Sequence, residues 1–526
     1  MKKKLSTIIC ALIAALTFVF AAVGFTACDK DDASLNLLDE NILDDNYDNY
    51  YEIFVYSYND SDGNGVGDLN GVTEKLGYLR DLGYTGIWLM PIMPSSSYHG
   101  YDVTDYYNIN PTYGTLDDYD NLVETAHEMG IKVIIDLVVN HTSKDHPWFK
   151  AALAYQKGQS GGSAKYSSYY NFSRTQLDHY HNDGGIYYEG QFDSYMPDLN
   201  LEEESVRSEI DNIIKFWLER DTDGFRLDGC LYYCGSGSVN AKSVEVCNFI
   251  KETAVKYNPK AYIVGEAWDI RSTIVQFYGS GADSFFYFPA AGNGDIAKAV
   301  NSKSALEIFR SINNCQTAAG DYIPAPFLSN HDSGSGLLGR IAVKMARDAD
   351  KIKFAYGLLS LFSGSTFTYY GDEVGMIAKD ANNDPDLRVG MLWDNEGTGK
   401  TMLPPGASGE AEFLFGSVAD QLKDTSSILN YYKLCNNARN AFPALMRGTA
   451  ERTVLDDSNI LLMTKTYKNT ALNVDQTLTI VVNLADTAKT VGNISGELAQ
   501  QICVSGSIKQ SGTTLSMPKY SIAILT

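Results

Sequence analysis

Residues 224–229 read Gly-Phe-Arg-Leu-Asp-Gly, a short apolar run that carries two charged side chains. Successive side chains of a strand point to opposite faces, so Arg226 and Asp228 share one face while Phe225 and Leu227 share the other. In a closed parallel sheet, the apolar pair would face the surrounding helices and the charged pair the mouth of the barrel. The arginine would keep the aspartate ionised.

The same kind of unit recurs along the chain, because short apolar, β-branched or aromatic runs repeatedly precede segments of helical period. The helical segments include Asp117–Met129, Glu202–Arg220 and Ala342–Leu361. Eight strands are expected, at Glu52–Tyr58, Gly86–Ile92, Lys132–Asn140, Gly224–Gly229, Tyr262–Trp268, Ser284–Pro289, Pro326–Asp332 and Ser365–Asp372. Eight alternating units predict an α/β fold of the (β/α)8 TIM barrel type.

Two regions depart from this alternation. Residues 141–200 are rich in Tyr, Ser, Gly, Asn and His and are far too long for an ordinary loop between a strand and a helix. We interpret them as a small domain inserted after strand 3, which divides the barrel into residues 48–140 and 201–442. Residues 443–526 contain short alternating runs such as Ile460–Tyr467, which predict a C-terminal antiparallel β-sandwich.

The N-terminus predicts export. Three lysines at positions 2–4 precede an apolar run over residues 5–20 and then small residues, which is the pattern of a signal peptide over residues 1–27. An uncleaved membrane anchor is the alternative. The sequence Phe-Thr-Ala-Cys28 resembles the lipobox of bacterial lipoproteins, which implies attachment to the cell surface through a lipid on Cys28. Residues 28–47, rich in Asp and Asn, would form a flexible tether.

Composition narrows the range of functions. The net charge of −23 argues against a nucleic-acid partner, since phosphates are held by clusters of Lys and Arg. The 35 tyrosines suit the faces and hydroxyls of sugar rings. The cysteines beyond Cys28 are too sparse for a disulfide framework, so we expect structural thiols, either unpaired or paired only locally, as between Cys230 and Cys234.

Four of the expected strands end in polar side chains, at the place where active sites of such barrels form. These residues are Asp136, Asn140 and His141 of strand 3, Arg226 and Asp228 of strand 4, Glu266 of strand 5, and Asn330, His331 and Asp332 of strand 7. Taken singly, each acid has a structural explanation, as a helix cap or the partner of a surface lysine. Taken together, an ionised carboxylate beside a carboxyl group that can hold a proton is the equipment for glycoside hydrolysis with retention.

These motifs, with Met196-Pro-Asp-Leu-Asn200 as a fifth, resemble the signature regions of the α-amylase family of glycoside hydrolases (family 13) over nearly all of the mature length. The resemblance implies Asp228 as nucleophile, Glu266 as general acid/base, and Asp332 as the acid that binds the distorted sugar. It also implies sugar contacts in subsite −1 from His141, Arg226 and His331, with Tyr101 stacking beneath the ring. Arg388 matches a further family segment and is assigned to substrate binding. For the histidines, the alternative is a buried, hydrogen-bonded structural role.

Residues 60–68 read Asp-Ser-Asp-Gly-Asn-Gly-Val-Gly-Asp, with oxygen ligands at every second position and glycines between them. Such a loop can wrap a hard cation. Many members of the family have a calcium site of this form after the first strand, which implies structural Ca²⁺ here. A solvated acidic turn is the alternative. The expected ligands are Asp60, Asp62, Asn64, the carbonyl oxygen of Val66, and Asp68.

Departures from the family pattern guide the substrate prediction. Tyr98 stands where members that remove terminal glucose typically have a blocking aspartate, so we expect an open cleft. Gly-Cys-Leu-Tyr-Tyr233 follows Asp228 in place of the usual Lys-His, which alters the leaving-side sugar contacts and argues against a second calcium on Asn140 and Asp198.

The 196–200 motif resembles that of an intermediate group of α-amylases. We therefore predict endo-cleavage of α-1,4 bonds in starch and maltooligosaccharides. The rival predictions are neopullulanase or cyclomaltodextrinase activity, oligosaccharide α-glucosidase activity, transglycosylation, and, from another class, a non-catalytic glucan-binding lipoprotein.

Overall fold

The computed structural model describes residues 35–526 except residues 236, 238, 239 and 335. The predicted signal peptide and the predicted lipid site at Cys28 lie outside the described residues. Within the described part of the chain, no helix combines the length and the apolar character needed to cross a bilayer.

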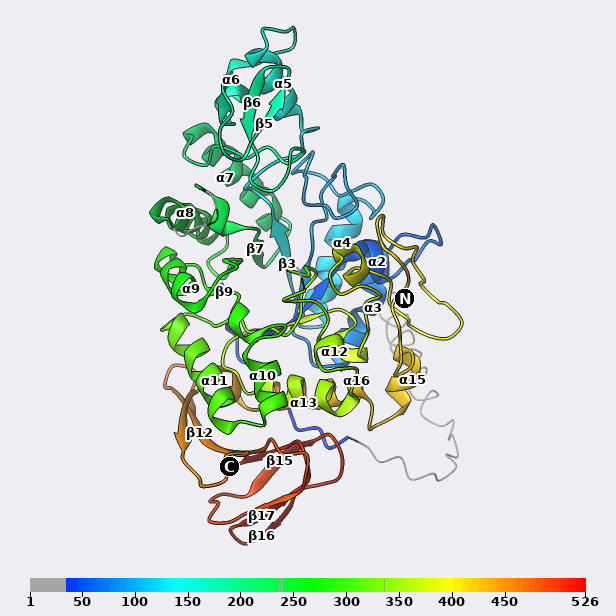
Figure 1. Ribbon diagram of the computed structural model, residues 1–526, viewed down its shortest axis with the longest axis vertical. Helices are drawn as coiled ribbons and strands as arrows, with labels where there is room; N and C mark the ends of the chain where they lie inside the picture. The colour runs from blue at the N-terminus through cyan, green and yellow to red at the C-terminus, as the bar shows by residue number, and fades with distance from the viewer. Residues whose placement is uncertain (1–34, 236, 238–239, 335) are drawn as a thin grey trace, which may run out of the picture. The chain divides into compact units, whose positions relative to one another are not determined.

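A parallel sheet forms the centre of the protein (Figure 1). In spatial order its strands are β10 (Thr366–Tyr369), β1 (Asn49–Ile53), β2 (Gly86–Leu89), β3 (Lys132–Leu137), β7 (Gly224–Leu227), β8 (Tyr262–Gly265) and β9 (Ser284–Phe285). Apart from Lys132, every residue of these strands is buried. Burial on both faces is typical of a parallel sheet that is covered by helices.

Residues 325–327 occupy the remaining strand position between β9 and β10. Phe286 bridges to Ala325 and Phe327 bridges to Phe367, both in parallel register. The predicted strand Pro326–Asp332 is therefore wrong in extent. Pro326 has no N–H to donate to a ladder, and the chain beyond Leu328 runs as a loop. The predicted TIM barrel is confirmed, with its seventh position reduced to these two bridges.

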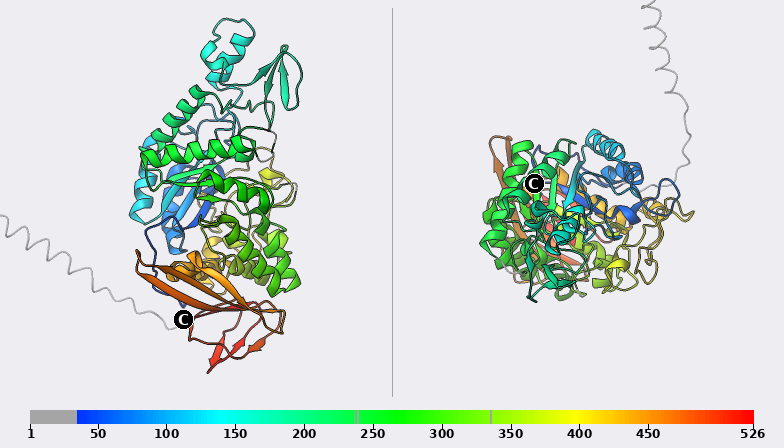
Figure 2. Two further views of the ribbon diagram at one scale, coloured as in Figure 1. Left: turned by 90° about the vertical axis from the view of Figure 1, so that its left-hand side faces the viewer. Right: turned by 90° about the horizontal axis from the view of Figure 1, so that it is seen from above.

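Helices surround the sheet (Figures 1 and 2). The longer ones are α3 (Leu69–Asp81), α4 (Leu116–Glu128), α7 (Glu204–Leu218), α8 (Ala241–Tyr257), α9 (Arg271–Phe277), α10 (Asp295–Ser302), α11 (Ala305–Ala319), α13 (Ala349–Leu359) and α16 (Ile428–Ala441). In α7 the buried residues include Val206, Ile210, Ile213 and Trp217. This spacing of three or four residues gives the helix one apolar face, which packs on the barrel.

Two predicted elements are each divided in the structure. The predicted strand Glu52–Tyr58 ends at Ile53, and Val55–Tyr58 form the short helix α2, because the buried residues fit helical spacing as well as strand alternation. The predicted helix Ala342–Leu361 is α12 (Ile341–Lys344) followed by α13. Ala346 and Arg347 between them have φ angles of 55° and 62°, which a right-handed helix does not accommodate.

The insert after β3 forms a small domain of its own. It contains α5 (Pro147–Gln156), α6 (Ala164–Ser167) and a sheet of β4 (Phe172–Ser173), β6 (Ile186–Glu189) and β5 (Tyr180–Asp183). This domain, cyan to green in Figure 2, lies at the opposite end of the barrel from the C-terminal strands, which are orange to red.

The C-terminal region confirms the predicted antiparallel β domain. One sheet contains β11 (Thr449–Thr453), β12 (Ile460–Asn469), β13 (Val474–Asn483), β18 (Ser521–Leu525) and β15 (Leu498–Cys503). The other contains β14 (Lys489–Val491), β17 (Thr514–Met517) and β16 (Lys509–Ser511). Buried apolar residues of both sheets, among them Val481, Ala523, Leu515 and Met517, form one core cluster.

The remaining elements are short. They are the helices α14 (Asp384–Leu387), α15 (Val418–Lys423) and α17 (Pro443–Arg447), and the 3-10 turns η1 (Cys230–Tyr232), η2 (Tyr278–Ser280), η3 (Phe288–Ala290) and η4 (Asp372–Val374). The six cysteines of the described residues carry free thiols, so of the two expectations for Cys230 and Cys234 the unpaired one holds.

Residues 36–47 differ from the predicted flexible tether. The backbone N–H of Asn41 donates to the carbonyl of Asn440 at 2.8 Å, and that of Leu38 donates to the side chain of Asn437 at 2.8 Å. Asp45 forms an ion pair with Arg447 at 2.6 Å. Backbone hydrogen bonds and this ion pair therefore hold the segment against α16 and α17.

Candidate active site

One buried arginine joins three carboxyl groups at the carboxyl ends of neighbouring strands. Nη1 of Arg226 in β7 donates to Oδ1 of Asp228 and to Oδ1 of Asp136 in β3, both at 2.7 Å. Its Nη2 lies 2.8 Å from Oε2 of Glu266, which follows β8. The register of β3, β7 and β8 brings these residues side by side, although they are up to 130 positions apart, from 136 to 266, in the sequence.

Glu266 is placed to act as an acid. Its Oε2 accepts a hydrogen bond from the Gly229 N–H at 3.1 Å and forms the ion pair with Arg226, which leaves Oε1 to carry a proton. Burial raises the pKa of Glu266 to about 8, against the opposing effect of Arg226 and with a further upward contribution from Asp228. Burial therefore favours the protonated form of this carboxyl group.

Asp332 faces the same space from the loop after residues 325–327. Its Oδ1 accepts a hydrogen bond from Nη2 of Arg388 at 2.8 Å, and its Oδ2 lies 3.3 Å from Nε2 of His331. Arg388 also donates from Nε to the carbonyl oxygen of His331 at 3.0 Å. The arginine thus fixes both the acid and the backbone that carries it.

Tyr101 and two neutral histidines complete the floor of the site. The Tyr101 hydroxyl lies 2.8 Å from Nε2 of His331 and 3.2 Å from Oδ2 of Asp136. Nε2 of His141 lies 3.0 Å from the carbonyl oxygen of Tyr101. Burial lowers the pKa of both histidines, so they are uncharged hydrogen-bonding groups at neutral pH.

These groups open into a cleft of about 770 Å³. The structure brings all eight sequence-predicted catalytic and sugar-binding residues together: seven line the cleft, and Arg226 lies buried beneath it. Further residues also line it, among them Tyr98 and members of the 196–200 and 229–233 stretches that guided the substrate prediction. They are His99, Phe192, Asp193, Tyr195, Met196, Gly229, Leu231, Tyr232, Trp268, Asp384 and Pro385 as well as Tyr98.

Several of these additional residues come from the inserted domain and from loops. Only folding brings them to the barrel mouth, so no strand-end rule could find them. Glu52 of β1 was also missed. It contacts Nδ1 of His331 at 2.6 Å, and its place near the end of the first strand was the available signal.

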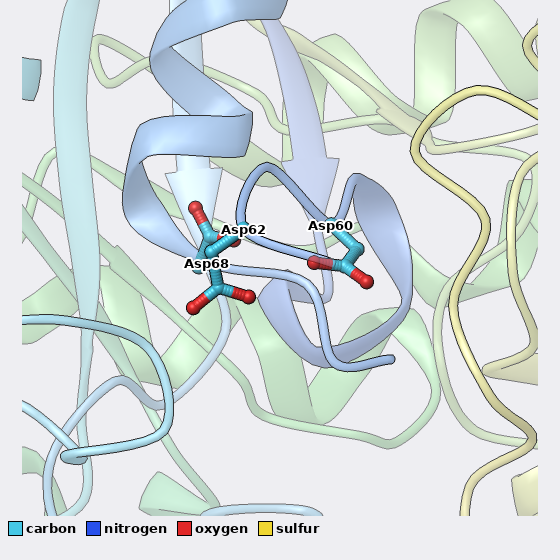
Figure 3. A group of neighbouring side chains, drawn as sticks. All are labelled: Asp60, Asp62 and Asp68. Carbon is cyan, nitrogen blue, oxygen red and sulfur yellow. The ribbon is translucent and has the colours of Figure 1, made fainter. Parts of the chain in front are cut away.

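A separate acidic cluster lies in the loop between α2 and α3 (Figure 3). One carboxylate oxygen from each of Asp60, Asp62 and Asp68 lies within 4.8 Å of the others. The N–H groups of Gly63 and Gly65 donate to Asp60, both at 2.7 Å. Asn64, an expected fourth ligand, donates to Asp62 at 3.0 Å and accepts from the N–H of Val66 at 2.8 Å.

Comparison with known proteins extends these observations. The family model of the α-amylase catalytic domain matches residues 52–448. Alpha-amylase 3 of Dictyoglomus thermophilum is 37% identical over 431 residues, covering 78% of this chain and 81% of the relative. The solved structure of Amy13B from Eubacterium rectale has a TM-score of 0.86 and 37% identity, covering 93% of this chain and 96% of the other.

A relative with a different named activity matches a shorter part of the chain. The trehalose-6-phosphate hydrolase of Bacillus subtilis is 44% identical over 192 residues, which is 34% of each protein.

Proposed function

Because the chain belongs to the α-amylase family of glycoside hydrolases, we propose that it cleaves internal α-1,4-glucosidic bonds of starch and maltooligosaccharides with retention of configuration. The observation that carries this proposal is the shared guanidinium contact of Asp228 and Glu266. Two carboxyl groups bound to one arginine lie close together. Retaining glycosidases need this closeness, because their two catalytic carboxyl groups are roughly 5–5.5 Å apart and leave no room for a water molecule between the sugar and the nucleophile.

In the first step, Asp228 attacks the anomeric carbon of the sugar. Arg226 binds Oδ1 of Asp228, which leaves Oδ2 as the attacking oxygen. The proton on Oε1 of Glu266 passes to the glycosidic oxygen as the bond to the leaving sugar breaks. In the second step the deprotonated Glu266 takes a proton from water, which attacks the covalent glycosyl-enzyme and releases the sugar with its original configuration.

Asp332 and the groups around it would bind the reacting sugar. Asp332 accepts hydrogen bonds from sugar hydroxyls while Arg388 holds its other oxygen. Tyr101 offers its ring face, and His141 and His331 offer neutral nitrogen atoms. Such contacts favour catalysis where they strengthen as the ring distorts toward its transition state.

Aromatic residues would hold the leaving part of the chain. Phe192 of the inserted domain is 44% exposed, and its ring centroid lies 4.9 Å from that of Tyr232. A side-chain carbon on Gly229, whose N–H binds Glu266, would lie only 2.8 Å from the Phe192 ring, so this ring is close to the acid. Tyr232 lies in the stretch after Asp228 where the family usually has Lys-His, and together with Phe192 it provides stacking surface for sugars.

The other end of the cleft supports internal cleavage. Tyr98 packs edge-on against Phe54 and Tyr56, with ring centroids 6.2 and 6.4 Å away, and presents no carboxylate to a chain end. The cleft volume of about 770 Å³ falls in the range of pockets for ligands larger than a single sugar residue.

We also propose that the loop of residues 60–68 holds structural Ca²⁺. The donor set fits a hard cation, since three carboxylates converge and the backbone N–H groups of Gly63 and Gly65 fix Asp60. Asn64 and the Val66 carbonyl belong to the same loop and would complete the set. The ion would neutralise the repulsion among the acids and hold the loop against the start of α3, where Asp68 caps the helix.

We also propose that the protein is located at the cell surface. The sequence of residues 1–28 supports export and attachment to the cell surface through a lipid on Cys28. Extracellular starch would then be the natural substrate pool.

Product analysis tests the proposed specificity. Purified protein is incubated with maltoheptaose and with pullulan, with Asp228→Asn as the inactive control. We expect maltose and maltotriose as early products of the linear chain. Panose from pullulan would instead indicate neopullulanase action, and glucose as the sole early product would indicate an exo-acting glucosidase. Binding of soluble starch without release of reducing sugar would reject the enzyme proposal.

A further inference from the structure

Glu52 lies beneath the catalytic cleft and contacts one of the sugar-binding residues. It belongs to β1 and is 1% exposed. Its Oε1 lies 2.6 Å from Nδ1 of His331. On the far side of the same imidazole, Nε2 lies 2.8 Å from the Tyr101 hydroxyl and 3.3 Å from Oδ2 of Asp332. Glu52 therefore reaches the acid of the sugar site through a single ring.

The position of the ring proton follows from these contacts. A neutral imidazole carries one N–H, on Nδ1 or on Nε2. Asp332 is paired with Arg388 and acts as an acceptor. The Tyr101 hydroxyl donates to Oδ2 of Asp136 at 3.2 Å, so a hydrogen on Nε2 can be donated to the tyrosine oxygen or toward Asp332. A hydrogen on Nδ1 would instead require Tyr101 to turn its proton from Asp136 to Nε2, whose lone pair would then lie 3.3 Å from a carboxylate oxygen. The geometry therefore favours hydrogen on Nε2, and Nδ1 must accept its hydrogen from Glu52.

The surroundings of Glu52 also favour a neutral carboxyl group. The charged groups that face it are Arg226 of β7, Arg340 before α12, Asp136 of β3 and Asp332. Among the described residues, the ion pairs of Arg226 go to Asp136, Asp228 and Glu266, and that of Arg340 goes to Asp372. Burial raises the pKa of Glu52 well above its usual range, with Arg226 opposing and the two acids adding to the effect.

We propose that Glu52 is a positioning residue: as a neutral acid it donates its proton to Nδ1 of His331 and so keeps Nε2–H directed at Asp332 and the sugar hydroxyls. The effect of Glu52 on catalysis rests on the proposed glycosidase function. The proton assignment itself depends on the contacts of the ring alone. Glu52 also adds no negative charge next to Asp136 and Asp332, where another carboxylate would be repelled.

Two substitutions of Glu52 separate this role from a merely structural one. Glutamine has the same shape, and its amide N–H can donate to Nδ1 while carrying no titratable proton. We expect Glu52→Gln to keep kcat/KM within about threefold and to leave the pH profile unchanged, since a neutral group replaces a neutral group. Glu52→Met cannot donate, and the loosened ring should lower kcat by about 10²-fold, a loss typical of a displaced catalytic contact.

Glu373 supplies a matched control. It is also a fully buried acid, hydrogen-bonded by the hydroxyls of Tyr51 at 2.7 Å and Tyr78 at 2.8 Å, away from the cleft. Glu373→Met should lower the unfolding temperature as much as Glu52→Met does but leave kcat of the folded protein within about twofold. Equal losses of kcat in the two methionine variants would overturn the proposal.

A direct measurement reads the proton itself. Nitrogen-15 NMR of histidine-labelled wild-type protein, with the His331 signal assigned by its loss in His331→Gln, should show Nδ1 without hydrogen and Nε2 with it. A hydrogen on Nδ1 would contradict the assignment. A shift of the alkaline limb of the pH profile of kcat/KM in Glu52→Gln would also contradict it, because such a shift would show that the substitution removed a negative charge. This readout needs no turnover, so an inactive wild type would reject the proposed function without touching the assignment.

Discussion

The acids at the barrel mouth and the acids of the 60–68 loop are held in place by different means. Asp136, Asp228 and Glu266 are buried and share Arg226, which joins three separate strands. Asp60 is held by backbone N–H groups of its own loop, and Asp62 is exposed. The first arrangement exists only in the folded barrel, whereas the second is largely local. On this difference we base the proposal that one cluster serves the chemistry and the other the stability of the protein.

The largest effect is expected from a substitution that disables the acids of the barrel mouth and leaves the 60–68 loop unchanged. Asp228→Asn removes the nucleophilic oxygen but keeps the shape of the side chain, so kcat on maltoheptaose should fall by at least about 10⁴-fold. Arg226 retains its pairs with Asp136 and Glu266, and the protein should stay folded. Asp68→Asn, the matched change in the loop, should keep kcat within about threefold. Comparable losses in the two variants would erase the proposed division of roles.

The second expected effect is the pH dependence of the barrel mouth. Glu266 must be protonated to donate to the leaving oxygen, and its pKa is raised to about 8 by burial. Activity should therefore be retained at neutral pH and fall as pH rises through about 8, by about tenfold per unit beyond it. Measurements of kcat/KM between pH 6 and 10 test this alkaline fall in activity, with the unfolding temperature followed in parallel. A limb near pH 5 would show that the acid is not shifted upward.

The smallest expected effect concerns the loop. Removal of the proposed Ca²⁺ by a chelator should lower the unfolding temperature by about 3 °C, because a ligand present at about 100 times its Kd adds about 2.7 kcal/mol to stability and a chain of this length unfolds with an entropy of about 1 kcal/mol per kelvin. Turnover at 25 °C should change by less than about twofold, since no reacting group lies in the loop. Asp62→Ala should make the protein insensitive to the chelator. A chelator that stops turnover at once, with the fold intact, would place the ion in the chemistry.

Most of the barrel and its strand-end residues could be predicted from the sequence. Alternation put Arg226 and Asp228 on one face, and the fixed geometry of parallel strands brought Glu266 next to them. Local patterns could not place chain breaks that depend on single residues. Ala346 and Arg347 take positive φ values that their side chains do not demand, so the division of the predicted helix into α12 and α13 was not visible.

Contacts made only in the folded state could not be predicted either. Residues 36–47 read as a tether because they are polar, yet they find partners such as Asn437 and Asn440 about 400 positions away. Phe192 reaches the cleft only because the inserted domain packs over the barrel mouth. Glu52 was within reach of the strand-end argument, but its partner His331 lies 279 positions further along the chain.

The most direct test of the proposed retaining mechanism is to trap the covalent intermediate. The protein is incubated with an activated fluoro-glucosyl substrate whose glycosyl-enzyme hydrolyses slowly, then digested and analysed by mass spectrometry. We predict one added glycosyl group, on the peptide that contains Asp228 and on that side chain. A label on Glu266 or Asp332, or release of product with inverted configuration and no label at all, would contradict the assignment of Asp228 as nucleophile.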